Sequence, residues 1–397
     1  MKSRSLMVFL IVMGSFLFLI TGITQVTAGE VGVTPTIVKI GVIPTLSGAA
    51  ATPGKHILAG IQASVQALNN DEGLFGRKIK LSIEDGQYKP PVTVACVKKL
   101  IFRDKVFCVG ATTGGPTAIA TFPIHQKEKV PLVAPITWSS AMFKPFKRYV
   151  FSHSFPYETQ GSVLIDYMMK ELRAKSPKIG ILYQDDDYGQ SGLRGVEERL
   201  AHYGFKILAK EVYKRQGVEF ASQALNLKKA GVDYVVLFSV VRSTHLFLKE
   251  ARKWDWNPVF LGAAGMTDDK TLELAGDNAR NLYGVINLAL ADDKCPGMLK
   301  MKERMEKYQH GEGIFMYTTY GYTAMEILKE GLRLAGKDLT RENLVKALEK
   351  LRDFDAEGLM SPISYGPNNR SSGRAAFIVK ADVKTKKWVR ASDWIMP

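Results

Sequence analysis

The chain has 397 residues, 46% of them hydrophobic, and a formal net charge of +15. A chain of this length exceeds one ordinary hydrophobic core, and its apolar content can fill two domains. It has no tract of clustered Arg and Lys residues, which argues against nucleic-acid binding. The positive balance indicates either a solvated basic surface or attraction to anionic ligands or to a membrane-bound partner.

The first 28 residues have the order of a secretory signal peptide. Lys2 and Arg4 precede an apolar run over 6–23, and the small residues of Val26-Thr27-Ala28 follow. This order predicts cleavage before Gly29 and export of the remaining chain. A retained membrane anchor is the alternative, because the apolar run is nearly long enough to span a bilayer. The abrupt change to polar sequence favours removal.

From residue 37 onwards, short apolar strands alternate with amphipathic helices. This alternation is typical of a parallel sheet covered on both faces. The first run has predicted strands at 37–43, 78–84, 106–109 and 132–134, and predicted helices at 54–68 and 92–102.

A second run repeats the pattern. The first run contains Lys39-Ile40-Gly41-Val42 and the second opens on Lys178-Ile179-Gly180-Ile181, and each leads through a polar loop into a helix. We therefore predict two similar α/β lobes. The second run has predicted strands at 178–183, 206–212, 234–238 and 259–261, and predicted helices at 188–203, 219–229 and 244–254.

The last part of the chain changes character. We predict a strand at 282–288, a long helix at 314–334 and a helix at 340–351 that Thr340 caps. Because no flexible linker separates the lobes, several short crossings should form a hinge. The tail has predicted short strands at 363–365, 375–381 and 388–390.

Three cysteines, Cys96, Cys108 and Cys295, are too few for a disulfide scaffold. Cys96 lies in a predicted helix and Cys108 in the strand after it, so a bridge is possible in an oxidising compartment. Both have apolar neighbours, among which a buried thiol packs well. We favour packing over a bridge.

Polar loops follow the predicted strands of the first lobe. They cover 44–48, 110–117 and 134–140, and they combine hydroxyl side chains with glycines. In a parallel sheet these loops meet at the carboxyl edge, where ligands bind. Free amides and hydroxyls at helix starts suit a carboxylate. Capping by Ser and Thr explains any one loop, but three loops at one edge favour binding.

The second lobe offers three adjacent acids, Asp185 to Asp187, before Tyr188. They lack the alternating spacing and the distal Glu of a calcium loop, so we interpret at least one as a helix cap and predict no metal. Tyr188 could stack on a ligand or bond to it. No His-Glu-x-x-His pair, Gly-x-Ser-x-Gly elbow or Walker loop occurs. We therefore predict neither an enzyme nor a cofactor.

The order of these segments resembles the periplasmic branched-chain amino-acid binding proteins of ABC transporters, the leucine/isoleucine/valine-type class I receptors. The resemblance covers nearly all of the chain after residue 28. The segments that carry it are 40–48 (IGVIPTLSG), 69–77 (NNDEGLFGR), 99–101, 104–106, 130–132, 183–189 and 250–252.

The resemblance implies an α/β fold of two doubly wound parallel-sheet lobes that close over a ligand, joined by a three-crossing hinge. The lobes would be 34–150 with 285–355, and 151–284 with 356–397. It also implies a periplasmic location, an inner-membrane ABC permease as partner, and a protein that we expect to be a monomer.

The resemblance places a ligand carboxylate against the loops at 113–115 and 137–139 of the first lobe, and it makes Tyr188 the aromatic residue of the second lobe that covers the ligand. Family members that bind leucine-like amino acids have an acid after the strand at 259–261, but Ala264 stands there in this chain. Either Asp268 or Asp269 substitutes for it, or the ligand carries no amine. Trp138, unusually large for its position, either stacks on the ligand or packs as core. The predicted ligand-binding residues are Ser47, Thr113, Gly114, Gly115, Thr137, Trp138, Ser139, Tyr157, Tyr188 and Asp268.

The sequence thus predicts an exported solute-binding protein that delivers a small carboxylate to an ABC permease. Amino acids are the leading ligand class, followed by aromatic or aliphatic carboxylates that lack an amine. Two other classes of function stay open. One is a ligand-sensing module of a signalling system built on the same fold, and the other is a secreted hydrolase, for which the sequence offers no catalytic constellation.

Overall fold

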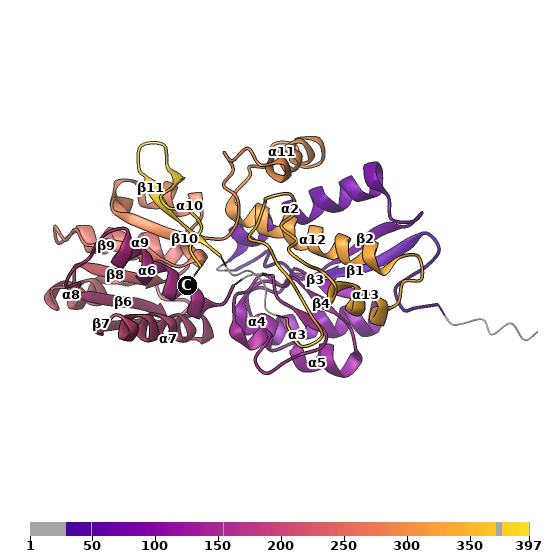
Figure 1. Ribbon diagram of the computed structural model, residues 1–397, viewed down its shortest axis with the longest axis horizontal. Coiled ribbons are helices and arrows are strands. Elements are labelled where there is room, and N and C mark those ends of the chain that lie inside the picture. Colours follow the sequence, from indigo (N-terminus) through magenta and orange to yellow (C-terminus); the bar gives the residue numbers. More distant parts are fainter. Residues whose placement is uncertain (1–28, 49, 154, 371–374, 397) are drawn as a thin grey trace, which may run out of the picture.

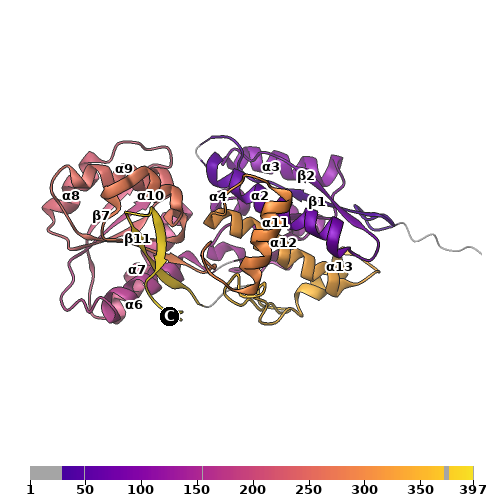
Figure 2. The same ribbon diagram turned by 90° about the horizontal axis from the view of Figure 1, so that it is seen from above.

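The computed structural model describes residues 29–48, 50–153, 155–370 and 375–396. Two α/β lobes lie side by side along the long axis of the molecule (Figure 1), and the view from above separates them again (Figure 2). The predicted signal peptide, residues 1–28, lies outside the described residues. Within the described part of the chain, no helix combines the length and the apolar character that crossing a membrane requires.

The first lobe is built on a five-stranded sheet with the order β2-β1-β3-β4-β5, in which all pairs are parallel. Strands β3, β4 and β5 are fully buried and β1 largely so because helices cover the sheet, which explains their apolar sequences, whereas the edge strand β2 is mostly exposed or half-buried. The strands are β1 (Ile37–Val42), β2 (Lys78–Ile83), β3 (Cys108–Gly110), β4 (Leu132–Val133) and β5 (Val150–Phe151). The helices that we assign to this lobe are α2 (Ala51–Ala67), α3 (Pro90–Lys98), α4 (Gly115–Ile119), α5 (Phe122–Glu128), α11 (Pro296–Tyr308), α12 (Met316–Ala335) and α13 (Arg341–Leu348).

The second lobe has a seven-stranded sheet with the order β12-β11-β10-β9-β8-β6-β7. Strands β6 to β10 are parallel, whereas β11 and β12 are added in the antiparallel sense. The strands are β6 (Ile179–Gln184), β7 (Ile207–Tyr213), β8 (Tyr234–Phe238), β9 (Val259–Gly262), β10 (Leu282–Ile286), β11 (Phe377–Asp382) and β12 (Lys387–Arg390). The helices are α6 (Tyr157–Lys170), α7 (Asp187–His202), α8 (Ala221–Lys229), α9 (Val241–Arg252) and α10 (Asp269–Ala275).

The chain passes between the lobes three times: between β5 and α6, between β10 and α11, and between Arg370 and β11. The crossings are tied together near the first sheet. The Ser152 amide donates to the carbonyl of Arg370 at 3.2 Å, and the Ala289 amide donates to that of Leu359 at 2.8 Å. Tyr365 also donates its hydroxyl to the carbonyl of Ser152. The lobe bounds expected from the sequence remain a prediction, while these contacts place Tyr365 and Arg370 beside the first sheet.

One predicted strand is wrong. Residues 363–365 form no strand, because Ile363 makes only an isolated bridge with Phe354. Pro362 precedes this residue and lacks an amide hydrogen, and the Tyr365 amide donates instead to the carbonyl of Leu351 at 3.1 Å. The predicted cap of α13 is confirmed, since the Thr340 hydroxyl accepts from the Asn343 amide at 3.1 Å.

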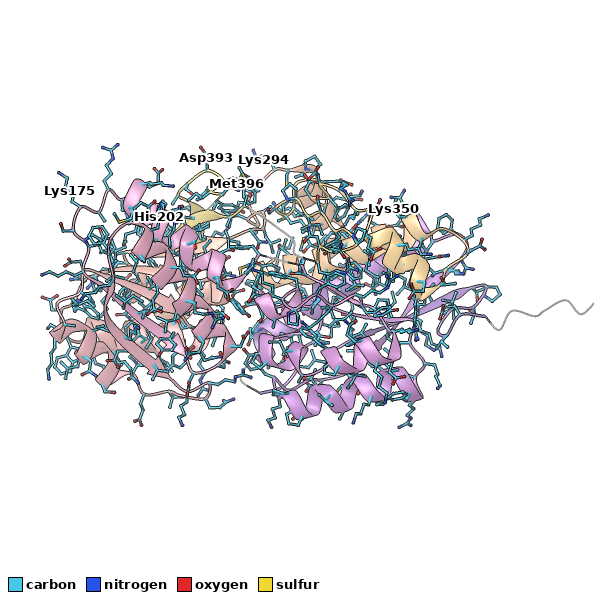
Figure 3. The ribbon with its side chains drawn as sticks, turned by 60° about the horizontal axis from the view of Figure 1, so that its bottom comes forward. Lys175, His202, Lys294, Lys350, Asp393 and Met396 are labelled. Atoms are coloured by element: carbon cyan, nitrogen blue, oxygen red, sulfur yellow. The ribbon has the colours of Figure 1, made fainter. Side chains whose placement is uncertain are left out.

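The cysteines are free thiols, which confirms packing over a bridge. Cys108 is fully buried on β3, and burial raises its pKa to about 12. The Cys96 thiol lies 3.6 Å from the carbonyl of Asp85. The excess positive charge lies on exposed side chains such as Lys175, Lys294 and Lys350, which extend outward from both lobes (Figure 3).

Helices α2 and α12 approach each other with glycine on both sides of the contact. A Cβ atom on Gly60 would lie 2.0 Å from the carbonyl oxygen of Thr318, and one on Gly321 would lie 2.1 Å from that of Ile57. Neither backbone oxygen can move without displacing its helix. This close contact therefore excludes any larger residue and fixes how α12 lies against α2.

Replacing Gly60 with valine should lower the free energy of unfolding by about 3 kcal/mol, because the overpacked helices must separate. Urea denaturation followed by circular dichroism measures the change. The matched control is Lys55→Val on the exposed face of the same helix, which we expect to change stability by less than about 1 kcal/mol. Equal effects of the two substitutions would show that valine in α2, and not the contact, is responsible.

Candidate functional site

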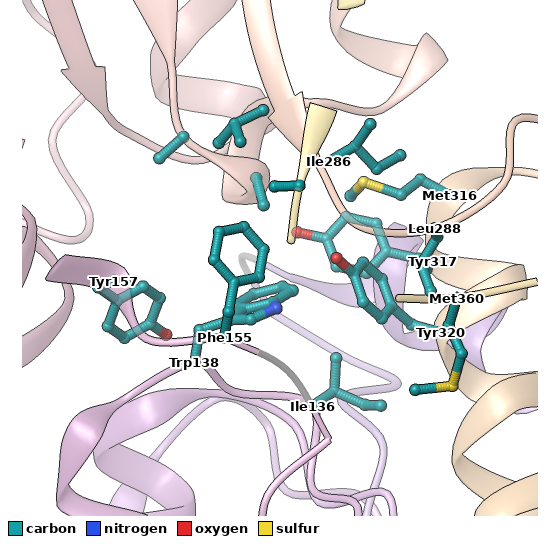
Figure 4. Packing of buried hydrophobic residues seen from close by; sticks show 14 of the residues in the cluster. Ile136, Trp138, Phe155, Tyr157, Ile286, Leu288, Met316, Tyr317, Tyr320 and Met360 are labelled. Atoms are coloured by element: carbon teal, nitrogen blue, oxygen red, sulfur yellow. The ribbon is translucent and has the colours of Figure 1, made fainter. Parts of the chain in front are cut away.

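A cavity of about 260 Å³ lies between the lobes at the carboxyl ends of both sheets. Loops that follow β1, β2, β3, β4, β7, β8 and β9 contribute to its lining, together with the last residue of β6. Much of the wall is aromatic, and Figure 4 shows several of these rings gathered where the lobes meet. The aromatic side chains that line it are Tyr88, Trp138, Tyr157, Tyr188 and Tyr317.

The loop after β3 brings Thr113 and Gly114 to the cavity. Thr113 forms a parallel bridge with Ile136, which extends the β3–β4 pairing to the sheet edge. The Thr113 hydroxyl is buried and has no hydrogen-bond partner among the described residues. Gly114 has a φ of 95°, a conformation that favours glycine, and its amide donates to the carbonyl of Ile136 at 3.0 Å. Gly115 opens α4 and does not line the cavity.

The loop after β4 contributes Trp138, which packs edge-on against Tyr320 with ring centroids 5.1 Å apart. The indole also lines the cavity, and its N–H has no partner among the described residues. Trp138 therefore belongs to both the core and the cavity wall. Thr137 and Ser139 lie behind the wall: the Thr137 hydroxyl is 3.3 Å from that of Tyr157, and Ser139 donates to the Asp187 carboxylate of the other lobe at 2.6 Å.

The second lobe supplies Tyr188 from the first turn of α7. Its ring lies 4.8 Å from that of Tyr157, and its hydroxyl donates to the carbonyl of Ser239 at 3.2 Å. Asp186 caps this helix by accepting from the amides of Tyr188 and Gly189 at 3.0 and 3.4 Å, which confirms the predicted cap. Within the described residues, no three His, Cys, Asp or Glu side chains are grouped as metal ligands.

Asp268 is a buried acid in the cavity wall. One carboxylate oxygen accepts from the Lys270 amide at 2.9 Å and caps α10, while Oδ2 has no partner among the described residues. The side chain is only 2% exposed, and burial raises its pKa to about 7. Asp269 does not line this cavity. At the position of Ala264, the backbone amide donates to Gln160 at 3.0 Å.

Six predicted residues line the cavity together: Thr113, Gly114, Trp138, Tyr157, Tyr188 and Asp268. The other four, Ser47, Gly115, Thr137 and Ser139, do not. Ser47 is exposed, and its hydroxyl donates to Asp85 at 2.5 Å. Contact of any of these residues with a ligand remains a prediction.

The sequence interpretation missed other residues of the wall. The Arg215 guanidinium lies 4.5 Å from the ring centroid of Tyr88 in the first lobe and donates to Asp186 at 2.5 Å. Both Tyr88 and Arg215 follow strands, so considering every strand end would have found them. Tyr317 lies on α12 and donates to the carbonyl of Gly265 at 3.1 Å across the cleft. Nothing in the sequence singles it out.

Asp268→Asn should stabilise the unliganded protein at pH 8 by about 2–4 kcal/mol. The folded-state pKa of about 7 lies above the ordinary value of 3.8, so folding favours the protonated acid. The wild type should lose this stability as pH rises from about 4 to 7, whereas asparagine keeps the cap without the charge. Urea denaturation at pH 8 and pH 4 tests this, and a gain of equal size at both pH values would contradict it.

The chain matches the periplasmic binding protein family over residues 37–387. A leucine-, isoleucine-, valine-, threonine- and alanine-binding protein of Pseudomonas aeruginosa is 23% identical over 300 residues, 76% of this chain and 79% of that protein. Solved structures share the fold, which confirms the predicted class I architecture. A branched-chain amino acid ABC transporter protein from Thermus thermophilus with bound valine is 18% identical, with a TM-score of 0.83 over 92% of this chain and 98% of that one.

A fatty acid ABC transporter substrate-binding protein from Thermomonospora curvata is similar to the same degree. It is 22% identical, with a TM-score of 0.83 over 93% of this chain and 95% of that chain. Proteins of this one architecture are thus named for ligands with and without an amine. The match over residues 37–387 spans far more than half of the chain, and this protein therefore belongs to the periplasmic binding protein family.

Proposed function

We propose that this protein is the solute-binding component of an ABC importer and that it captures an amino acid or a related small carboxylate between its lobes. The observation that carries the proposal is the cavity of about 260 Å³ at the carboxyl ends of both sheets. Ligands of open α/β sheets bind at this edge. A ligand that touches both lobes stabilises the closed form relative to the open one.

Direct contacts across the cleft support a closing mechanism. Ser139 bonds to Asp187, the Tyr88 ring lies under Arg215, and Tyr317 bonds to Gly265. Each pair joins the first lobe to the second, so each is lost when the lobes separate. A ligand in the cavity adds its own contacts to these and thereby favours the form that a permease would recognise.

The composition of the wall supports the ligand class. Aromatic and aliphatic side chains cover most of it, and three cations, Arg215, Arg242 and Lys270, lie among them. A mostly apolar pocket with a few convergent polar groups is typical of a small-molecule site. Apolar walls with nearby cations suit a molecule that has an apolar body and a carboxylate. The family relatives described above are named for amino acids and for a fatty acid, and both kinds of ligand have these features.

The proposal also includes the setting in which the protein works. Removal of residues 1–28 would release a monomer into the periplasm, where it would deliver its ligand to a permease in the inner membrane. The two lobes would move relative to each other about the three crossings. The residue bounds of the lobes would be near those that the sequence predicts. Capture needs no cofactor, because no covalent bond is made or broken.

Isothermal titration calorimetry of ligand-stripped protein tests the proposal. The titrants are a panel of amino acids together with the carboxylic acids that lack their amines. We expect at least one member to bind at 1:1 stoichiometry with a Kd of about 1 μM or tighter, or about −8 kcal/mol. Lys350→Ala, far from the cleft on an exposed position, should bind identically. Failure of the folded protein to bind any member of the panel would overturn the proposal.

A further inference from the structure

Exposed cations occur on both lobes, but the net charge of the chain is unevenly divided. Residues 86–150 contain ten Lys and Arg residues and only two acids, Asp104 and Glu128, which gives +8 of the formal net charge of +15. Residues 151–295, which include β6 to β10 of the second lobe, contain nineteen bases and nineteen acids. More than half of the excess positive charge therefore lies in one stretch of the first lobe.

This stretch forms one of the two helical layers that cover the first sheet. In Figure 1, α3, α4 and α5 lie along the lower side of the first lobe, whereas α2 and α12 lie above them. A hydrophobic cluster of its own holds the layer together, with Val97 of α3, Phe122 of α5 and Met142 packed with Leu132 and Val150 of the sheet. Residues 296–355, which supply α12 and α13 to the other layer, have eleven bases and ten acids. The excess charge thus belongs to one side of the lobe.

Six exposed cations of this layer have no ion-pair partner among the described residues. Of the other four cations, Lys99 and Arg148 form ion pairs, Lys147 donates to backbone carbonyls, and Lys89 adjoins Tyr88 at the cavity. Exposed like charges that have no counter-charge within the chain suit an anionic partner. The six residues come from α3, from α5, from the turns after them and from the loop before β5: Lys98, Arg103, Lys105, Lys127, Lys129 and Lys144.

Two large apolar side chains lie among these cations. Phe102 is 49% exposed and directly precedes Arg103, and Phe146 is 44% exposed and lies between Lys144 and Lys147. Exposed aromatic rings can enter the interfacial layer of a bilayer while the cations around them meet lipid phosphates. A small anion needs donors that converge on one point, whereas these charges are spread over a whole layer. We call the six cations together with Phe102 and Phe146 the basic face.

We propose that the basic face docks on an anionic phospholipid bilayer. No residue of this face lines the cavity between the lobes, so docking goes beyond ligand capture and does not depend on it. Docking would keep the protein beside the bilayer in which a permease resides. Because the cations are exposed, dissolved salt should screen their attraction to the lipid.

Co-sedimentation with phospholipid vesicles tests the proposal. The protein used begins at Gly29, which keeps both lobes and removes the apolar run at 6–23 that could itself insert into a bilayer. In about 50 mM salt, the partition coefficient should be at least about 100-fold higher on vesicles with roughly one-third phosphatidylglycerol than on pure phosphatidylcholine. Raising the salt to about 0.5 M should remove most of this difference.

Neutralising three cations of the basic face should lower the partition coefficient on the anionic vesicles about 100-fold, since each cation near such a surface contributes a factor of about five. This triple variant is Arg103→Gln/Lys127→Gln/Lys144→Gln. The matched control has the same net charge but neutralises exposed, unpaired cations of the second lobe, and it should bind nearly as tightly as the wild type. It is Lys175→Gln/Lys206→Gln/Lys229→Gln.

A second pair of variants tests the apolar part of the face. Phe102→Ala should lower the partition coefficient on the anionic vesicles about fivefold, because the ring no longer enters the interface. Phe75→Ala is the control, since Phe75 is 46% exposed but lies in the turn before β2, outside the basic face. It should leave the partition coefficient unchanged.

Three results would overturn the proposal. The first is equal partition on anionic and neutral vesicles. The second is an equal loss of binding in the two triple variants, since net charge and not the basic face would then be responsible. The third is binding to a soluble anionic polysaccharide such as heparin without binding to vesicles, which would assign the face to a polymer. The triple variant of the basic face should still bind the tightest ligand of the panel with wild-type affinity, so failure of docking leaves the proposed function intact.

Discussion

Replacing Gly114 with alanine should weaken ligand binding between about fivefold and 30-fold while the protein stays folded. The added Cβ atom would lie 2.6 Å from Cε2 of Tyr88 and 2.8 Å from the hydroxyl of Thr117. Tyr88 would have to move, and its contact with Arg215 across the cleft would be lost. A cation–π contact of this kind contributes about 1–2 kcal/mol. Because it forms only when the lobes are together, its loss weakens the closed, ligand-holding state.

The measurement is calorimetric titration of wild type and variant with the tightest ligand of the panel. Gly76→Ala is the matched control, because Gly76 has a φ of 80° and open space around its Cβ position. It imposes a similar backbone strain, worth about 1 kcal/mol, without a clash at the cleft. It should lower stability slightly and leave affinity unchanged. Unchanged affinity in Gly114→Ala would show that Tyr88 has no part in closure.

Replacing Arg370 with methionine should lower the free energy of unfolding by about 3–5 kcal/mol. The side chain is fully buried and donates to the Arg148 carbonyl at 2.9 and 3.1 Å and to the Glu349 carboxylate at 2.7 Å. Its guanidinium also lies 4.3 Å from the ring centroid of Phe151. Methionine fills similar volume but leaves the partly buried Glu349 carboxylate and the Arg148 carbonyl without their partner. Arg370 therefore anchors β5 to the chain that enters the third crossing.

Guanidinium chloride denaturation provides the measurement. Arg333→Met is the control, because Arg333 is 65% exposed and its ion pair with Glu330 should contribute about 0–1 kcal/mol. The double variant Arg370→Met/Glu349→Leu should regain part of the loss, since it removes the orphaned carboxylate. A loss of less than about 1 kcal/mol in Arg370→Met would contradict the anchoring role.

The fold was predictable where burial on both faces of a sheet imposes continuous apolar runs. Strands such as β1 and β8 occur where the sequence predicts them, and Thr340 caps α13 as expected. β5 has only two residues, Val150 and Phe151, which is too short to form a pattern. Residues 363–365 have the apolar character of a strand, but Pro362 and a competing bond to Leu351 keep them in a loop.

The part of the site that could be predicted from the sequence consists of residues that lie just after the ends of strands. Thr113, Trp138 and Asp268 all lie on loops after parallel strands, and the structure brings them to one cavity. Ser47 also follows a strand, but its hydroxyl bonds to Asp85, which follows the neighbouring parallel strand β2, and a single sequence does not show that these two loops bond to each other. Tyr317 reaches the cavity only because α12 packs beneath the cleft. Such contacts depend on how the lobes pack together, which one sequence does not reveal.

The central claim is that the two lobes close on a small carboxylate in the cavity between the sheets. Small-angle X-ray scattering of the ligand-stripped protein, before and after saturation with its tightest ligand, tests this claim most directly. The radius of gyration should decrease on saturation, because contacts such as Tyr317 with Gly265 form only when the lobes approach. Stoichiometric binding with an unchanged radius of gyration would contradict the account.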